Sequence, residues 1–204
     1  MANRRQFIQS GIALSALSSG ILSSVSASAA ADSASLKLDR FVFDTRFAEA
    51  FAIAQRMETL GVKLSPFAGN LMDLWYGELD QSWQRAPMAL AGITTEDSLF
   101  ILNTLAMDHK MGLVYRGEHS IVNDAQMVHK LAGPAAVIDA IRQADMGLGW
   151  EAAMSDVLSK CPLGAPAMTA TEIVTPVRGM HLRDVPLFSW IIAPRAAVAS
   201  TINR

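Results

Sequence analysis

The sequence predicts an α/β fold, a small three-layer sandwich with a mostly parallel sheet of about five strands. Three observations predict this fold. Short apolar runs alternate with segments whose apolar residues recur at helical spacing. The run at 88–93 is continuously apolar, which is typical of a strand buried on both faces of a sheet. Turn-forming glycine, proline and asparagine separate the segments, and this alternation favours parallel strands joined by covering helices.

Two strand–helix units open the predicted domain. A strand at 41–43 precedes a helix at 46–60, whose apolar positions lie one turn apart and which ends before a glycine. A second strand at 62–67 precedes a helix at 70–86, which ends before a proline. Asn70 is the predicted N-cap of that helix, because its side chain can accept a hydrogen bond from an amide of the first turn.

The same pattern continues through the middle of the chain. The strand at 88–93 precedes a helix at 95–111 with acidic residues in its first turn. A fourth strand is predicted at 113–115. Two helices are then predicted at 122–132 and 134–144, the second with proline at its first position.

The remaining residues complete the prediction. A helix at 150–160 follows a glycine-containing break, and the stretch 162–186, rich in proline, threonine and glycine, is predicted to be irregular. The apolar run at 187–193 is the predicted fifth strand. We therefore expect one α/β domain over residues 30–204.

The residues before this domain have the order of a secretory signal. Residues 3–9 read Asn-Arg-Arg-Gln-Phe-Ile-Gln, and no charge occurs from residue 6 to residue 31. Small residues occupy 27–29, where a signal peptidase would cleave. This apolar stretch is short and rich in serine and glycine, so we expect no stable membrane anchor after cleavage.

Arg4, Arg5 and Phe7 resemble the motif of twin-arginine (Tat) signals, although Asn3 and Gln9 depart from its usual hydroxyl and basic residues. The resemblance implies recognition by the Tat translocase, transport in the folded state and a periplasmic location. It also implies a signal peptide at 1–29 that is cleaved near Ala29. The alternative is an ordinary Sec signal that happens to contain paired arginines.

Composition restricts the partners of the mature chain. About 175 residues remain after cleavage, which is enough for one hydrophobic core. The formal charge changes from −2 to −4, because the leader contains Arg4 and Arg5 and no acidic residue. A mildly acidic chain without a basic run argues against nucleic acid as a partner.

Polar residues follow several predicted strands at the edge where ligands bind in open parallel sheets. They provide guanidinium groups, carboxylates, hydroxyls and an imidazole, and the adjacent helix starts provide amides suited to an anion. The alternative for the acidic and hydroxyl residues is simple helix capping. The candidate ligand-binding residues are Asp44, Arg46, Thr94, Thr95, Arg116, Glu118 and His119.

Motifs for other chemistries are missing from the sequence. The four histidines lack metal-ligand spacing, and no glycine-rich nucleotide loop or nucleophile elbow occurs. Cys161 is the single cysteine and cannot form an internal disulfide, so it is predicted to be a small buried residue, the alternatives being a nucleophile or an intermolecular disulfide. We therefore expect neither a metal nor a cofactor.

These observations favour a non-enzymatic role. The expected function is binding of a small anion, or an accessory role to a co-exported oxidoreductase. The alternative is an enzyme for a small acidic substrate, with His119 as acid/base and Asp44 or Glu118 orienting it. Convergence of Arg46, Arg116 and His119 in one pocket would favour ligand binding or catalysis. An exposed apolar patch of methionine and tryptophan would favour a partner protein.

Overall fold

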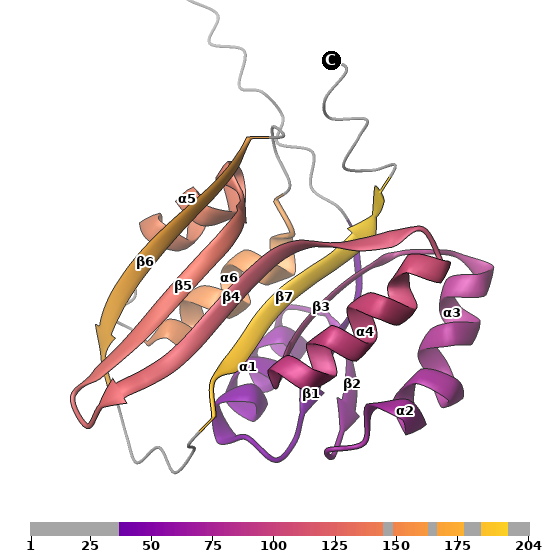
Figure 1. The fold of residues 1–204 in the computed structure, drawn as a ribbon, viewed down its shortest axis with the longest axis horizontal. Coiled ribbons are helices and arrows are strands. Elements are labelled where there is room, and N and C mark those ends of the chain that lie inside the picture. The colour runs from indigo at the N-terminus through magenta and orange to yellow at the C-terminus, as the bar shows by residue number, and fades with distance from the viewer. Residues whose placement is uncertain (1–36, 145–148, 163–166, 178–184, 196–204) are drawn as a thin grey trace, which may run out of the picture. The chain divides into compact units, whose positions relative to one another are not determined.

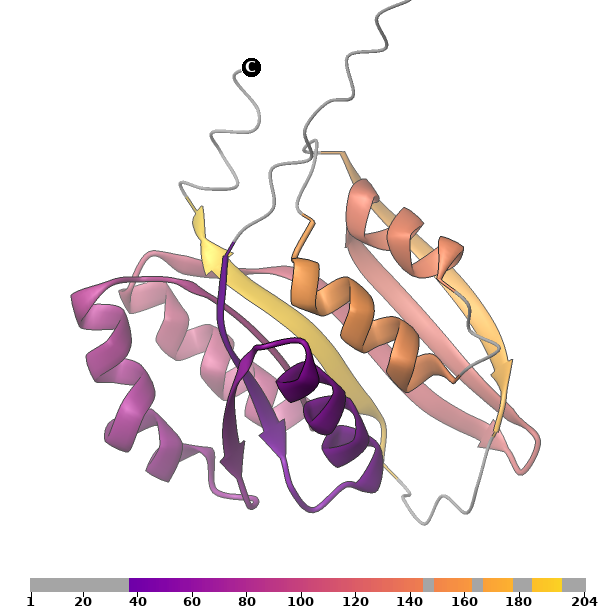
Figure 2. The same cartoon turned by 180° about the vertical axis from the view of Figure 1, so that it is seen from behind.

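The computed structural model describes residues 37–144, 149–162, 167–177 and 185–195. The predicted signal at 1–29 lies outside these ranges. The described residues form one seven-stranded sheet with strand order β2-β1-β3-β7-β4-β5-β6 and helices on both faces (Figures 1 and 2). The α/β prediction is therefore confirmed.

One half of the sheet is parallel, with β1 between β2 and β3. The connection from β1 to β2 contains one helix, and the connection from β2 to β3 contains three short helical segments. The elements are β1 (Leu38–Asp44), α1 (Ala48–Thr59), β2 (Lys63–Phe67), α2 (Leu71–Leu74), η1 (Trp75–Leu79), α3 (Asp80–Arg85) and β3 (Ala89–Thr94). Asn70 caps α2 as predicted, because its side chain accepts a hydrogen bond from the amide of Met72.

The other half of the sheet is antiparallel, and β7 joins the two halves by pairing with both β3 and β4. The strands β4, β5 and β6 form a meander beyond it. The elements are α4 (Glu96–Asp108), β4 (Met111–Asn123), β5 (Gln126–Pro134), α5 (Ala135–Gln143), α6 (Trp150–Lys160), β6 (Met168–Pro176) and β7 (Leu187–Pro194).

Three predictions about this half are wrong. The sheet is mixed and larger than the predicted mostly parallel sheet of about five strands. The fourth strand does not end at Tyr115 but continues to Asn123, and the predicted helix at 122–132 is the hairpin into β5. The stretch 162–186, predicted to be irregular, contains β6.

Burial explains the hairpin. On β5, Met127, His129 and Leu131 are buried, whereas the residues between them are half-buried or exposed. This alternation with a period of two is the pattern of a strand covered on one face. Asn123 begins the turn by accepting a hydrogen bond from the amide of Ala125.

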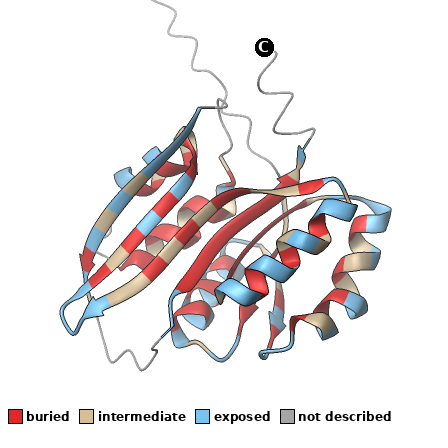
Figure 3. Ribbon diagram, viewed as in Figure 1, coloured by how far each residue is buried: buried red, intermediate tan, exposed pale blue. Residues whose placement is uncertain are grey.

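Each face of the sheet has its own apolar core. The helices α1, α5 and α6 cover one face, where Phe41, Ile53 and Ile138 are among the buried residues. The helices α2 to α4 cover the other face, where Trp83 and Trp190 are buried. This second layer lies over β1, β3 and β7, and in the described part of the chain no helix covers the same face of β5 and β6 (Figures 1 and 3). Burial colouring accordingly alternates along β5, while β6 is mostly exposed (Figure 3).

The central strands are packed very closely. At Gly92 of β3, a Cβ atom would lie 2.3 Å from Cζ2 of Trp190, so only glycine fits beneath this indole. Within the described ranges, no helix has both the length and the apolar composition needed to cross a membrane.

Candidate functional site

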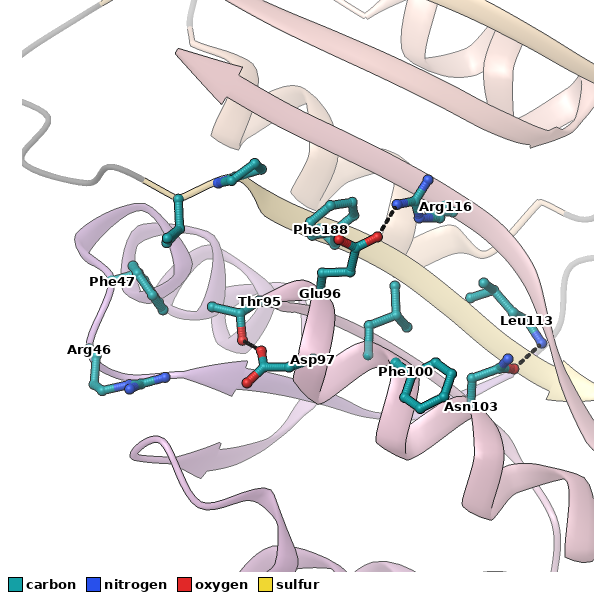
Figure 4. Close-up of a pocket in the computed structure, with 13 residues that line it drawn as sticks. Arg46, Phe47, Thr95, Glu96, Asp97, Phe100, Asn103, Leu113, Arg116 and Phe188 are labelled. Carbon is teal, nitrogen blue, oxygen red and sulfur yellow. Dashed lines mark hydrogen bonds and ion pairs between the residues drawn. The ribbon is translucent and has the colours of Figure 1, made fainter.

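A groove opens where the chain leaves β1 and β3. Its volume is about 970 Å³, and the first turn of α4 forms one of its sides (Figure 4). We call it the α4 groove. The residues that line it are Arg46, Phe47, Thr95, Glu96, Asp97, Leu99, Phe100, Asn103, Leu113, Arg116, Val185, Pro186 and Phe188.

The topology of the sheet creates this groove. The strands β1 and β3 are parallel neighbours, so their carboxyl ends lie at the same edge of the sheet. The helix after β1 packs on one face, and the helix after β3 packs on the other. Chains that diverge in this way leave a crevice between them, which is the usual ligand position in open α/β sheets.

Arg46 is held at one end of the groove by Asp44. The buried Asp44 carboxylate accepts hydrogen bonds from Nε of Arg46 at 3.0 Å and from Nη2 at 2.6 Å. It also accepts one from the Arg46 amide, which fixes the turn after β1. The hydrogen bond to this carboxylate raises the pKa of Arg46 above its usual value. The backbone of Gly69 lies against the guanidinium, where a Cβ would be 3.1 Å from Nη1.

Arg116 lies on the other side of the first turn of α4 (Figure 4). Its Nη2 donates a hydrogen bond of 2.9 Å to Glu96, whose side chain is 70% exposed. Its guanidinium carbon lies 4.5 Å from the centre of the Phe188 ring. The ring therefore supports the cation, while the exposed carboxylate is its weakly held partner.

The start of α4 carries a polar cluster between these two arginines. The Thr95 hydroxyl donates a hydrogen bond to the Asp97 carboxylate, and Arg46 points toward this pair (Figure 4). The hydrogen bond from Thr95 is the main reason that the pKa of Asp97 lies below its usual value, and the charge of Arg46 also lowers it. Asp97 is therefore ionised at neutral pH.

Apart from Asn103, the rest of the groove is apolar. Phe47, Leu113 and Phe188 contribute to its walls, and Phe100 extends from α4 with 70% of its surface exposed. An aromatic ring this exposed on a solvent-facing helix position has no role in the core. The groove therefore combines a charged end with an apolar surface.

Of the seven candidate residues, Arg46, Thr95 and Arg116 line the groove, and Asp44 orients one of them. Thr94 is buried beneath the groove. Its hydroxyl accepts a hydrogen bond from the indole of Trp190 at 3.1 Å and donates one to the carbonyl of Thr95.

Glu118 and His119 do not lie in the groove, because β4 continues past Arg116. Glu118 lies two residues further along on the same face of the strand, and His119 points to the opposite face because side chains alternate. Glu118 accepts a hydrogen bond from the Ser120 hydroxyl, and its carboxylate is 4.0 Å from the amine of Lys130. His119 is fully buried on the opposite face of the sheet.

His119 belongs to a hydrogen-bonded chain within the core. Its Nδ1 is 2.7 Å from Nδ1 of His129, and its Nε2 is 2.7 Å from the Ser189 hydroxyl. The chain continues from His129 to Thr175 at 2.8 Å and from Ser189 to Tyr115 at 3.1 Å. Serine beside histidine is the arrangement of a nucleophile and its base, but Ser189 and both imidazoles are fully buried. This chain satisfies polar groups between the sheet and α6.

The sequence prediction missed the carboxylates and the aromatic residues of the groove. Glu96, Phe100 and Asn103 recur at spacings of four and three, so they share one face of α4. An aromatic residue on that otherwise polar face was the available signal. Among the described residues, no three histidine, cysteine, aspartate or glutamate side chains come together as metal ligands would.

The fold and the groove define an α/β protein with a mixed sheet and a candidate ligand site at its topological switch point. Comparisons of the chain with protein-family models, with curated proteins and with solved structures return no match.

Proposed function

We propose that this is an exported, periplasmic protein that binds a small organic monoanion in the α4 groove. The observation that carries the proposal is the placement of Arg46 and Arg116 on either side of the α4 start, beside an apolar surface. Two guanidinium groups and helix amides suit a carboxylate, and the apolar walls suit the remainder of an organic acid.

Arg116 is the better candidate for direct contact with the ligand. Its ion pair with Glu96 is exposed, and such pairs contribute only about 0 to 1 kcal/mol. A ligand carboxylate can therefore replace Glu96 at little cost. The Phe188 ring beneath the guanidinium keeps it in place during the exchange.

Arg46 has a more rigid setting. Asp44 accepts hydrogen bonds from its Nε and Nη2, so the guanidinium is held in one orientation at the end of the groove. This anchoring reduces the side-chain entropy that is lost on binding. Asp44 is thus a positioning residue for Arg46.

The charge balance limits what can bind. Asp44, Glu96 and Asp97 outnumber the two arginines, so each further negative charge on a ligand adds repulsion, and a monoanion is favoured over a polyanion. Inorganic phosphate would also leave the apolar walls exposed to water. A monocarboxylate with an aromatic or aliphatic body fits both properties, and the groove volume is within the usual range for such ligands.

The face of the sheet on which His119 lies argues against the enzymatic alternative. Its imidazole is buried away from the groove, with neither Asp44 nor Glu118 among its hydrogen-bond partners in the described chain. An accessory role to a co-exported oxidoreductase stays a prediction.

The test measures protection of the exported protein against thermal unfolding by 3-phenylpropionate. The neutral 3-phenylpropanol and inorganic phosphate are the matched probes. A ligand present at ten times its Kd stabilises the fold by about 1.4 kcal/mol, and we expect this only for the carboxylate. Arg116→Gln should weaken binding by about tenfold or more, since it removes a charge-assisted hydrogen bond.

Arg56→Gln is the matched control, because Arg56 also forms an exposed bidentate pair, with Asp156, but lies outside the groove. It should bind the probe as the wild type does. Equal protection by the alcohol and the acid, or an unchanged affinity in Arg116→Gln, would remove the groove as an anion site.

A further inference from the structure

The two edges of the sheet differ in their protection against pairing with another strand. The edge strand β2 has five residues, including Pro66, which cannot donate a backbone hydrogen bond. The edge strand β6 has nine residues, with its only proline at the end and Glu172 as its only charge. Edge strands of this length are usually blocked by proline, charge or a covering element. Among the described residues, the β6 edge has no covering element, no proline before its last position and a single charge (Figures 1 and 3).

Backbone hydrogen bonds at the two ends of β6 show which residues face the free edge. The amide of Val177 donates to the carbonyl of Ala125, and the amide of Ala135 donates to the carbonyl of Ala167. Both bonds continue the unshifted β5–β6 register. The N–H and C=O groups of successive residues point to opposite sides of a strand, so the odd-numbered residues of β6 form hydrogen bonds with β5. The N–H and C=O groups of Ala170, Glu172 and Val174 therefore point to the free edge.

A row of charges crosses the sheet and ends at this edge. Glu118 of β4 pairs in register with Lys130 of β5, which pairs in register with Glu172 of β6. Oppositely charged residues directly across from each other stabilise neighbouring strands, and like charges destabilise them. The row alternates acid, base, acid, so the next position is one where a cation is favoured.

We propose that the edge of β6 docks an extended segment of a partner protein that carries Lys or Arg opposite Glu172. Apolar β-branched residues two positions away on that segment would lie beside Ala170 and Val174. Val174 is 53% exposed on the uncovered face of the sheet. A second copy of the chain fits less well, because β6 contains no Lys or Arg to place opposite Glu172. This surface is independent of the α4 groove.

The test uses the labelled peptide Thr-Val-Thr-Lys-Thr-Val-Thr and the exported protein, with binding followed by fluorescence anisotropy. Glu172→Gln should weaken binding by up to about fivefold, the equivalent of one cross-strand charge pair. Glu172→Lys should bind the Lys peptide poorly and the corresponding Glu peptide better than the wild type does.

Two variants test the backbone. Val174→Pro removes an amide from the edge and should abolish binding, whereas Val174→Thr keeps the amide and should retain it. Ala170→Pro is the second proline variant if Val174→Pro is unfolded by circular dichroism. Amide exchange in the wild type should slow at residues 170, 172 and 174 when the peptide is added.

Three results would overturn the proposal: no binding of the Lys peptide, equal binding of the Lys and Glu peptides, or full binding by folded proline variants. Concentration-dependent dimerisation that Val174→Pro abolishes would show that the edge serves self-association instead.

Discussion

Thr94→Val separates a structural threonine from a ligand-binding one. The Thr94 side chain is buried, and its hydroxyl accepts a hydrogen bond from the buried indole of Trp190. Valine preserves the shape of the side chain but leaves that indole N–H without its acceptor. An unsatisfied buried donor costs about 1 to 3 kcal/mol. The Thr95 carbonyl also loses a donor, but Thr95 is half-buried, so water can replace it.

The assay is urea unfolding followed by tryptophan fluorescence, together with thermal unfolding. We expect the free energy of unfolding to fall by about 1 to 3 kcal/mol, with a decrease in Tm of about 2 to 4 °C per kcal/mol. Thr94→Ser is the matched control, because it keeps the hydroxyl and loses only the methyl group. The affinity for 3-phenylpropionate should not change in Thr94→Val, since Thr94 does not line the groove. Equal stability of Thr94→Val and the wild type, or equal losses in the Val and Ser variants, would refute the hydrogen-bond argument.

Two further predictions concern titratable groups. The Thr95 hydrogen bond lowers the pKa of Asp97 in the folded protein. The ionised carboxylate therefore stabilises the fold fully above the unfolded-state pKa of about 3.9. This stabilisation is lost as the pH falls through the lower folded-state pKa. The difference in urea midpoint between the wild type and Asp97→Asn should therefore shrink from about pH 5 to about pH 2, and a constant difference would contradict this reasoning. Burial raises the pKa of Cys161 to about 12, so a thiol reagent at about pH 8 should label the protein only after unfolding in urea, and rapid labelling of the folded protein would show that the thiol is accessible.

The sequence supported the parallel half of the sheet better than the antiparallel half. The units around β1, β2 and β3 combine short apolar strands with capped amphipathic helices, so local pattern and final structure agree. The hairpin was mistaken for a helix because the apolar residues of 122–132 are compatible with either period over so short a stretch. Two features of the sequence indicated the hairpin: Asn123, which begins the turn, and the buried residues Met127, His129 and Leu131, which recur at every second position after it.

The strand β6 was missed for a different reason. Its sequence, Met-Thr-Ala-Thr-Glu-Ile-Val-Thr-Pro, has few apolar residues because it lies at an edge with one uncovered face. Threonine and valine are nonetheless residues with high strand propensity. Composition suggested a loop, whereas β-branching was the more reliable signal.

The site was predictable where it depends on strand order and unpredictable where it depends on strand length. Arg46 and Thr95 follow adjacent parallel strands, so the switch-point argument placed both correctly beside the groove. Arg116 lies within β4, and it lines the groove because its side chain is on the face of the strand that α4 covers. His119, three residues further along the same strand, points to the opposite face because side chains alternate.

The position of β7 has a consequence for biosynthesis. This strand lies between β3 and β4, yet the ribosome makes it after the other six strands. Until it is made, β3 and β4 each lack the neighbouring strand that joins the two halves of the sheet. The complete sheet therefore forms only after residues 187–194 have been translated. A chain truncated before residue 187 would leave β3 and β4 as unpaired strands that can aggregate. The proposed Tat route, which carries folded passengers, suits a protein whose central strand is made last.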